Sequence, residues 1–114
     1  MPCPNFLPVW SLSDAKKACK ILSFPLVLKP TDNMGARGVI RVDQAGGVEG
    51  AYRHAKSYST SGEVIVEKFM DGLELSIDCL VHDSEILCSG VADRIIARPP
   101  YFIELGHDLP SAQP

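Results

Sequence analysis

Residues 25–42 constrain the fold most, because they join two apolar runs through a lysine and a polar turn. They read PLVLKPTDNMGARGVIRV, with Lys29 closing the first run and Gly35 and Gly38 in the turn. The glycines let main-chain N–H groups approach an anion closely, and the lysine adds a mobile positive charge. The stretch therefore predicts a strand–loop–strand device that holds phosphate. It is not the Walker pattern, because the lysine precedes the loop and no helix begins directly after it.

An ordinary hairpin explains the same residues. Lys29 is then an edge-strand lysine that discourages aggregation, and Gly35 and Gly38 only permit the turn. A second segment, residues 64–81, favours the phosphate interpretation. It reads VIVEKFMDGLELSIDCLV, in which a strand ends on Glu67 and a later G-x-E-x-S pattern follows.

Together, the two segments resemble the ATP-grasp superfamily, the ATP-dependent carboxylate–amine ligases with carbamoyl-phosphate synthase and biotin carboxylase among their relatives. The resemblance implies a lysine and a loop over the triphosphate of ATP, main-chain groups at the adenine, and a glutamate at the ribose hydroxyls. Residues 102–111 look like the stretch that leads from this subdomain into the main body of such enzymes. The nucleotide-binding residues that the resemblance implies are Lys29, Gly35, Arg37, Gly38, Glu67, Lys68, Phe69, Met70 and Glu74.

The resemblance implies a role for each of these side chains, and the chemistry of each side chain also allows an ordinary alternative. The carboxylate of Glu74 accepts two hydrogen bonds from vicinal hydroxyls, whereas a solvated strand glutamate is the alternative. Arg37 pairs with the terminal phosphate or stays in solvent, and Phe69 packs on the base or belongs to the core. No role is assigned to Arg94, Arg98 or His107.

Helical stripes and alternating strands predict an α+β fold. One helix follows Ser11 or Ser13 as its N-cap, and a second lies near residues 48–58. Their apolar stripes are Ala15, Ala18, Cys19 and Leu22, and Val48, Ala51, Tyr52 and Ala55. With strands before and after the second helix, we expect an antiparallel sheet of about four strands covered by helices, the small lid subdomain of an ATP-grasp enzyme. The three expected parts are an irregular, extended lead-in (1–12), the subdomain (13–92), and a segment toward a larger subdomain (93–114).

Composition excludes several classes of function. The chain has 114 residues, a net charge of −3 and a pI near 5.5, which give no electrostatic footprint for nucleic acid or an anionic membrane. Four cysteines without CxxC spacing favour free thiols in a cytoplasmic setting, with Cys19 and Cys79 buried on apolar faces.

The metal ligands that ATP-grasp catalysis requires decide whether this sequence is expected to be active by itself. ATP-grasp ligases need divalent metal such as Mg²⁺ on the triphosphate, and the family holds it with a glutamate and a Glu-x-Asn pair. This sequence contains no Glu-x-Asn. We therefore expect an ATP-binding fragment of a ligase that activates a carboxylate as acyl phosphate for an amine, inactive without the rest of its parent enzyme. The alternatives are a non-catalytic nucleotide-binding or interaction module and a purely structural domain. The acyl substrate, the nucleophile and the oligomeric state stay open.

Overall fold

The computed structural model describes residues 2–113, except for the side chain of Cys88. The chain divides into two compact units. The first, Met1–Met70 with Arg98–Phe102, is called the helical unit here. The second, Asp71–Ala97 with Ile103–Pro114, contains only strands and is called the all-β unit.

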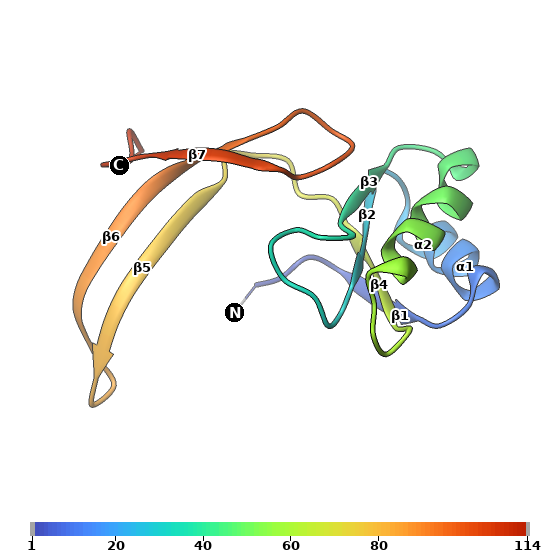
Figure 1. The fold of residues 1–114 in the computed structure, drawn as a ribbon, viewed down its shortest axis with the longest axis horizontal. Helices are drawn as coiled ribbons and strands as arrows, with labels where there is room; N and C mark the ends of the chain where they lie inside the picture. The colour runs from blue at the N-terminus through green and yellow to red at the C-terminus, as the bar shows by residue number, and fades with distance from the viewer. Residues whose placement is uncertain (1, 114) are drawn as a thin grey trace. The chain divides into compact units, whose positions relative to one another are not determined.

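The helical unit is a two-layer sandwich of a sheet and helices. Its sheet has the order β1-β4-β2-β3 with antiparallel neighbours, and α1 and α2 lie together on one face (Figure 1). A short 3₁₀ helix, η1, precedes α2. The elements are β1 (Phe6–Val9), α1 (Leu12–Leu22), β2 (Leu26–Pro30), β3 (Ile40–Val42), η1 (Ala45–Gly47), α2 (Val48–Ser57) and β4 (Val64–Lys68).

One hydrophobic core fills the space between this sheet and its helices. Leu28 on β2 lies opposite Val66 on β4, and neither side chain has accessible surface. Both predicted helical stripes point into this core, since α1 buries Ala15, Ala18 and Cys19, and α2 buries Val48, Ala51, Tyr52 and Ala55. Burial also raises the pKa of the Cys19 thiol, which agrees with its expected place among apolar side chains.

The predicted cap of the first helix is confirmed at Ser11. Its Oγ accepts a hydrogen bond from the Asp14 N–H at 3.1 Å, and Asp14 places a negative charge in the first turn. The helix ends at Ser23, whose N–H donates to the Cys19 carbonyl. Pro25 then lies between this helix and β2, directly before the first strand residue, as the sequence predicted.

The expectation that the opening segment lies outside regular structure is wrong. Residues Phe6–Val9 form β1 and pair with β4 from Phe6↔Glu67 to Val9↔Val64. Pro8 is tolerated because β1 is an edge strand, where a missing main-chain N–H costs no hydrogen bond on the outer side.

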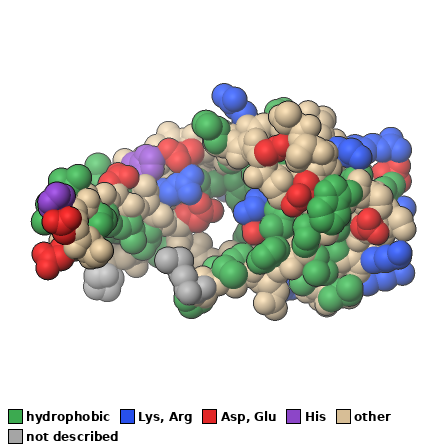
Figure 2. All heavy atoms as spheres, turned by 90° about the horizontal axis from the view of Figure 1, so that it is seen from below, with side chains coloured by type: hydrophobic (Ala, Val, Ile, Leu, Met, Phe, Trp, Pro, Cys, Tyr) green, Lys and Arg blue, Asp and Glu red, His purple; other side chains and the backbone are tan. Residues whose placement is uncertain are grey.

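The all-β unit is a three-stranded antiparallel sheet in the order β5-β6-β7. Its strands are β5 (Leu75–His82), β6 (Glu85–Ile96) and β7 (Glu104–Asp108). Most of its apolar side chains are exposed, and Figure 2 shows hydrophobic side chains on the surface of this unit, at left. The exposed large apolar residues of its strands are Leu75, Ile77, Leu80, Val81, Ile86, Leu87, Val91, Ile95 and Leu105.

The α+β class and the four-stranded antiparallel sheet covered by helices are confirmed. The membership of that sheet differs from the expectation, because β1 supplies an outer strand while β5 and β6 form a sheet of their own with β7. Cys79 on β5 is exposed, so its expected burial is wrong; its strand belongs to the all-β unit, which has no helix of its own to cover it. None of the helices among residues 2–113 is long and apolar enough to cross a membrane.

Candidate nucleotide site

Lys29 and Glu67 meet on the face of the sheet opposite the helices. In the register of β2 and β4, Lys29 pairs with Ile65 and Val27 with Glu67, which puts the lysine and the glutamate on one face as diagonal neighbours. Lys29 Nζ lies 2.8 Å from Glu67 Oε1. The glutamate side chain is only 16% exposed and the lysine 37%, so the ammonium keeps a solvent-facing side that an anion can approach.

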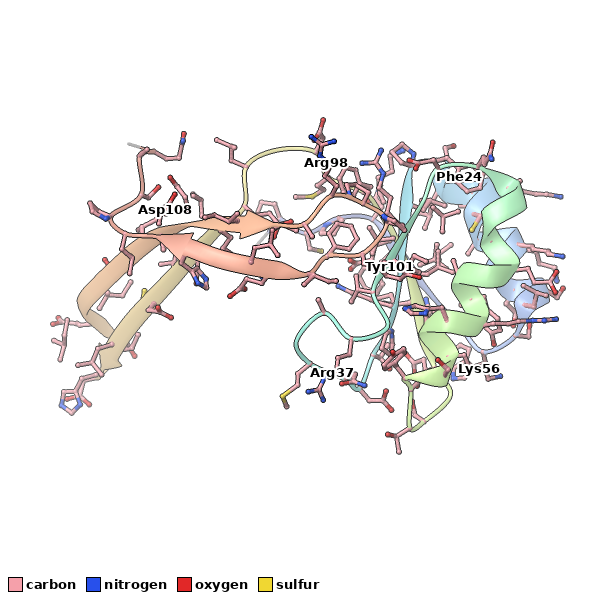
Figure 3. All side chains as sticks on the ribbon, turned by 45° about the horizontal axis from the view of Figure 1, so that its top comes forward. Phe24, Arg37, Lys56, Arg98, Tyr101 and Asp108 are labelled. Atoms are coloured by element: carbon pink, nitrogen blue, oxygen red, sulfur yellow. The ribbon has the colours of Figure 1, made fainter. Side chains whose placement is uncertain are left out.

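The glycine-containing loop follows β2 and carries main-chain donors at Gly35, Ala36 and Gly38, of which the first two residues are exposed and Gly38 is buried. Gly35 and Gly38 have φ values of +67° and +77°, and Ala36 between them has +58°. Within residues 2–113, the N–H groups of these three residues donate to no main-chain acceptor. The exposed amides of Gly35 and Ala36, in the loop that the chain enters after Lys29, are suited to a phosphate group. Arg37 is exposed in this loop (Figure 3).

The two glycines differ in how closely other atoms surround them. A Cβ on Gly35 would meet no heavy atom within 4 Å. A Cβ on Gly38 would stand 2.7 Å from Tyr58 Cβ and 3.0 Å from Pro30 Cδ. Gly38 is therefore required by close packing as well as by its positive φ.

The segment after Glu67 has its main-chain donors partly engaged. The Lys68 N–H donates to the Asn5 carbonyl at 2.8 Å, and the Phe69 N–H to the Pro25 carbonyl at 3.1 Å. Within residues 2–113, the Met70 N–H donates to no main-chain acceptor. A base edge that binds here has the Met70 N–H and the carbonyls of the segment available, whereas the first two N–H groups belong to the sheet.

The Lys68 side chain lies on the helical side. Its Nζ donates to the carbonyls of Ser23 and Phe24, both at 3.0 Å, and so binds carbonyls at the C-terminal end of α1. The Lys68 side chain therefore has a structural role, because it ties β4 to the end of α1.

Arg41 is a residue that the sequence analysis missed. Its guanidinium carbon lies 4.3 Å from the centre of the Phe69 ring, and its Nε donates to Asp43 Oδ1 at 2.8 Å. Phe69 also packs on Phe102, with ring centres 6.2 Å apart. Alternation in β3, where Arg41 stands between Ile40 and Val42, is the signal that puts the arginine on the face opposite the helices.

Glu74 belongs to the all-β unit, where it precedes β5 and forms an ion pair. Its Oε2 lies 3.2 Å from Arg94 Nη1, and Arg94 Nη2 lies 2.8 Å from Glu104 Oε2. His107 Nδ1 is 3.4 Å from Glu104 Oε1. Arg94 and His107, left without a role by the sequence, are therefore partners of carboxylates in this unit.

Metal ligation was tested among the described residues. No group of three or more His, Cys, Asp or Glu side chains in residues 2–113 is arranged to hold a metal ion. We assign no metal ligand to these residues.

Comparison with known proteins supports the resemblance that residues 25–42 and 64–81 suggested. The family model for the ATP-grasp domain matches residues 22–112. The large chain of carbamoyl phosphate synthase from Corynebacterium glutamicum is 27% identical over 96 residues, which cover 83% of this chain. The chain spans only 9% of that relative's length.

Two solved structures have the same arrangement of elements. The ADP complex of an N5-carboxyaminoimidazole ribonucleotide synthetase matches 98% of this chain and 29% of its own, with a TM-score of 0.77 and 23% identity. An L-amino acid ligase from Bacillus licheniformis matches 91% of this chain and 23% of its own, with a TM-score of 0.70 and 28% identity.

Proposed function

The chain belongs to the ATP-grasp family, and we propose that it is the ATP-binding part of a ligase. In that proposal, ATP converts a substrate carboxylate to an acyl phosphate, which an amine then attacks. The observation that carries it is the Lys29–Glu67 pair at 2.8 Å on the sheet face opposite the helices. The chain runs from Lys29 into a loop in which Gly35 and Ala36 are exposed and their N–H groups donate to no main-chain acceptor among the described residues. The solved ADP complex of a structural neighbour adds that a protein of this fold binds an adenine nucleotide.

Lys29 and the loop take the phosphate end. The ammonium of Lys29 neutralises phosphate oxygens, and the amides near Gly35 and Gly38 donate hydrogen bonds to them. Arg37, exposed in the same loop, is the proposed partner of the terminal phosphate. These groups act by electrostatic stabilisation and positioning, which is most of what phosphoryl transfer asks of a protein.

The segment from Glu67 to Met70 takes the adenine end. The free Met70 N–H and the carbonyls of Lys68 and Phe69 offer a donor and acceptors to the base edge. The Phe69 ring, with Arg41 at 4.3 Å, offers apolar surface. In this arrangement Glu67 joins both ends, because its carboxylate contacts Lys29 while its main chain begins the adenine segment.

Glu74 is the proposed ribose ligand, and Mg²⁺ the proposed companion of the triphosphate. A carboxylate accepts hydrogen bonds from two vicinal hydroxyls, and the pair with Arg94 orients the carboxylate of Glu74. Mg²⁺ would supply charge neutralisation and alignment of the γ-phosphoryl group. We propose that its ligands, the catalytic residues and the acyl-substrate site belong to the remainder of the parent enzyme. A cytoplasmic setting, where thiols stay reduced, completes the proposal.

A matched pair of glutamate variants tests this function. Glu74→Ala should weaken Mg·ATP binding, measured by calorimetry, by about three- to tenfold, because the two carboxylate oxygens that accept from the ribose hydroxyls are lost. The fold should survive, since Arg94 keeps Glu104 at 2.8 Å. Glu85→Ala, in the exposed first position of β6, is the control and should bind as the unmodified chain does. Equal affinities for the two variants would contradict the assignment of Glu74.

A further inference from the structure

The turn between α2 and β4, residues 58–62, holds the beginning of the glycine-containing loop. Asp32 Oδ2 accepts a hydrogen bond from the Ser61 N–H at 2.6 Å. Asn33 Nδ2 donates to the Tyr58 carbonyl at 2.8 Å. Two consecutive loop residues are thus bound to one turn that is 25 or more positions away in the sequence.

The same turn holds the other end of the loop. Gly38 lies so close to Tyr58 that an added Cβ would approach Tyr58 Cβ to 2.7 Å. The ring of Tyr58 packs on His54 of α2, with ring centres 5.2 Å apart. The end of the loop therefore rests on a side chain that the helix supports.

The turn is itself fixed by a network of serine hydroxyls. Ser59 Oγ donates to the Glu63 carbonyl at 3.0 Å and accepts from the Gly62 N–H at 3.0 Å. Ser61 Oγ accepts from the Glu63 N–H at 3.2 Å. Such side-chain hydrogen bonds to nearby main chain are what make short polar turns conformationally defined.

The centre of the loop has no such support. Met34 is 80% exposed, and Gly35 faces open space. The contacts of residues 34–37 among the described residues are local, such as the Arg37 N–H on the Met34 carbonyl at 3.4 Å. Such support at the two ends alone leaves the centre of the loop as the part least restrained by contacts.

We propose that Asp32 and Asn33 are positioning residues, which bind the turn of residues 58–62 and confine the motion of the loop to residues 34–37. This inference rests on the proposed function, because its consequence for binding is that the loop amides and Arg37 stay close to the phosphates. Ordering a loop costs conformational entropy on binding, and ends that are already held reduce that cost. The Ser61 N–H bond to Asp32 also lowers the pKa of that carboxyl, in keeping with an ionised acceptor in this contact.

The test compares loop order in Asp32→Ala, Asp32→Asn and the unmodified chain, by nitrogen-15 relaxation without nucleotide. In the unmodified chain, the amides of Asn33 and Gly38 should be as ordered as those of β2, and the amides of residues 34–37 less ordered. Asp32→Ala should spread the disorder to Asn33, while Gly38, which packs on Tyr58, should stay ordered. Asp32→Asn should restore order, because its amide oxygen still accepts from the Ser61 N–H. Glu49→Ala, which removes an exposed carboxylate paired only within α2, is the control and should change nothing.

A second variant and a binding measurement complete the test. Asn33→Ala removes the bond to the Tyr58 carbonyl and should also disorder the start of the loop. Asp32→Ala should raise the Kd for ATP about three- to tenfold, with the Leu28 and Val66 amides unchanged as proof of folding. Loop order that is unaffected in both alanine variants would overturn the inference. Absence of ATP binding to the unmodified chain would instead contradict the proposed function, and the relaxation data would still decide the role of the turn.

Discussion

Lys29 Nζ lies 2.8 Å from Glu67 Oε1 on the sheet face opposite the helices. The residue proposed to bind phosphate is therefore in direct contact with the first residue of the segment proposed to bind adenine. The contact spans two strands that are adjacent in the sheet but far apart in the sequence. It positions the lysine ammonium before any ligand arrives. In the proposed function, a bound phosphate would share Lys29 with Glu67, and the ion pair would connect the residues proposed for the two ends of the nucleotide.

Replacing the lysine should separate phosphate affinity from base affinity. Lys29→Met should weaken ATP binding about tenfold to a hundredfold, because a charge-assisted hydrogen bond to phosphate is lost, and leave adenosine binding nearly unchanged. Stability should fall by no more than about 1 kcal/mol, since the lysine end of the pair is solvent-exposed. Lys17→Met, on the exposed side of α1, is the control. Calorimetry with ATP, AMP and adenosine makes the comparison, and an equal loss for all three ligands would contradict a phosphate role.

The two loop glycines should respond differently to a methyl group. Gly38→Ala should destabilise the helical unit by about 2–4 kcal/mol, because the new Cβ meets Tyr58 and Pro30 as well as an unfavourable φ. Gly35→Ala adds only the cost of positive φ, about 1 kcal/mol, since its Cβ faces open space. Urea unfolding of both variants measures the difference. Equal losses would mean that Gly38 is not packed against the turn.

A leucine-to-alanine substitution should lower the stability strongly in the helical unit and hardly at all in the all-β unit. Leu28→Ala removes a fully buried side chain from the core of the helical unit and should cost about 2–5 kcal/mol. Leu80→Ala, where the side chain is 58% exposed on β5, should change stability by no more than about 0.5 kcal/mol. Thermal unfolding of the pair measures both. A large loss from Leu80→Ala would contradict the exposed position of that side chain.

Acid should release the segment after β7 from β6. The Ser111 hydroxyl donates to Asp93 Oδ1, and the Ala112 N–H donates to Asp93 Oδ2 at 3.0 Å. These bonds lower the pKa of the Asp93 carboxyl, with the hydroxyl as the larger cause. Because the folded form holds the proton less tightly than the unfolded form, the contact contributes stability above the ordinary carboxyl range and loses it as pH falls through the lowered pKa.

The Ala112 amide resonance reports this titration. Its chemical shift should be constant from neutral pH through the ordinary carboxyl range and change only at lower pH. In Asp93→Asn the shift should show no such change. A midpoint at or above the ordinary carboxyl value would contradict the contact.

The helices could be predicted from the sequence because apolar stripes and caps depend only on residues close together in the chain. The stripes of Ala15, Ala18 and Cys19 and of Val48, Ala51 and Tyr52 repeat with the period of one helix face, and both faces are buried. The Ser11 cap likewise needs only three residues. The class of the fold followed from these elements and the alternating strands between them.

Sheet membership and side-chain pairing were beyond the sequence because they depend on register across distant segments. The three prolines of the opening decapeptide obscured β1, whose pairing with β4 spans more than fifty residues. The Lys29–Glu67 contact and the Asp32–Ser61 bond arise only after β2 and β4 pair. The sequence analysis therefore singled out neither Arg41 nor Asp32, although the first contacts Phe69 and the second binds the Ser61 N–H beside the candidate site.

The most direct test of the account is a two-dimensional NMR titration of the labelled chain with Mg·ATP, with Mg·GTP as the control. The account predicts shifts at Lys29, in the loop of residues 33–38, at residues 67–70 and at Glu74, with ATP bound more tightly than GTP. The amides of α1 on the exposed side, such as Lys17, should stay in place. An unchanged spectrum at millimolar ATP, or equal shifts with both nucleotides, would contradict an ATP site built on Lys29 and Glu67.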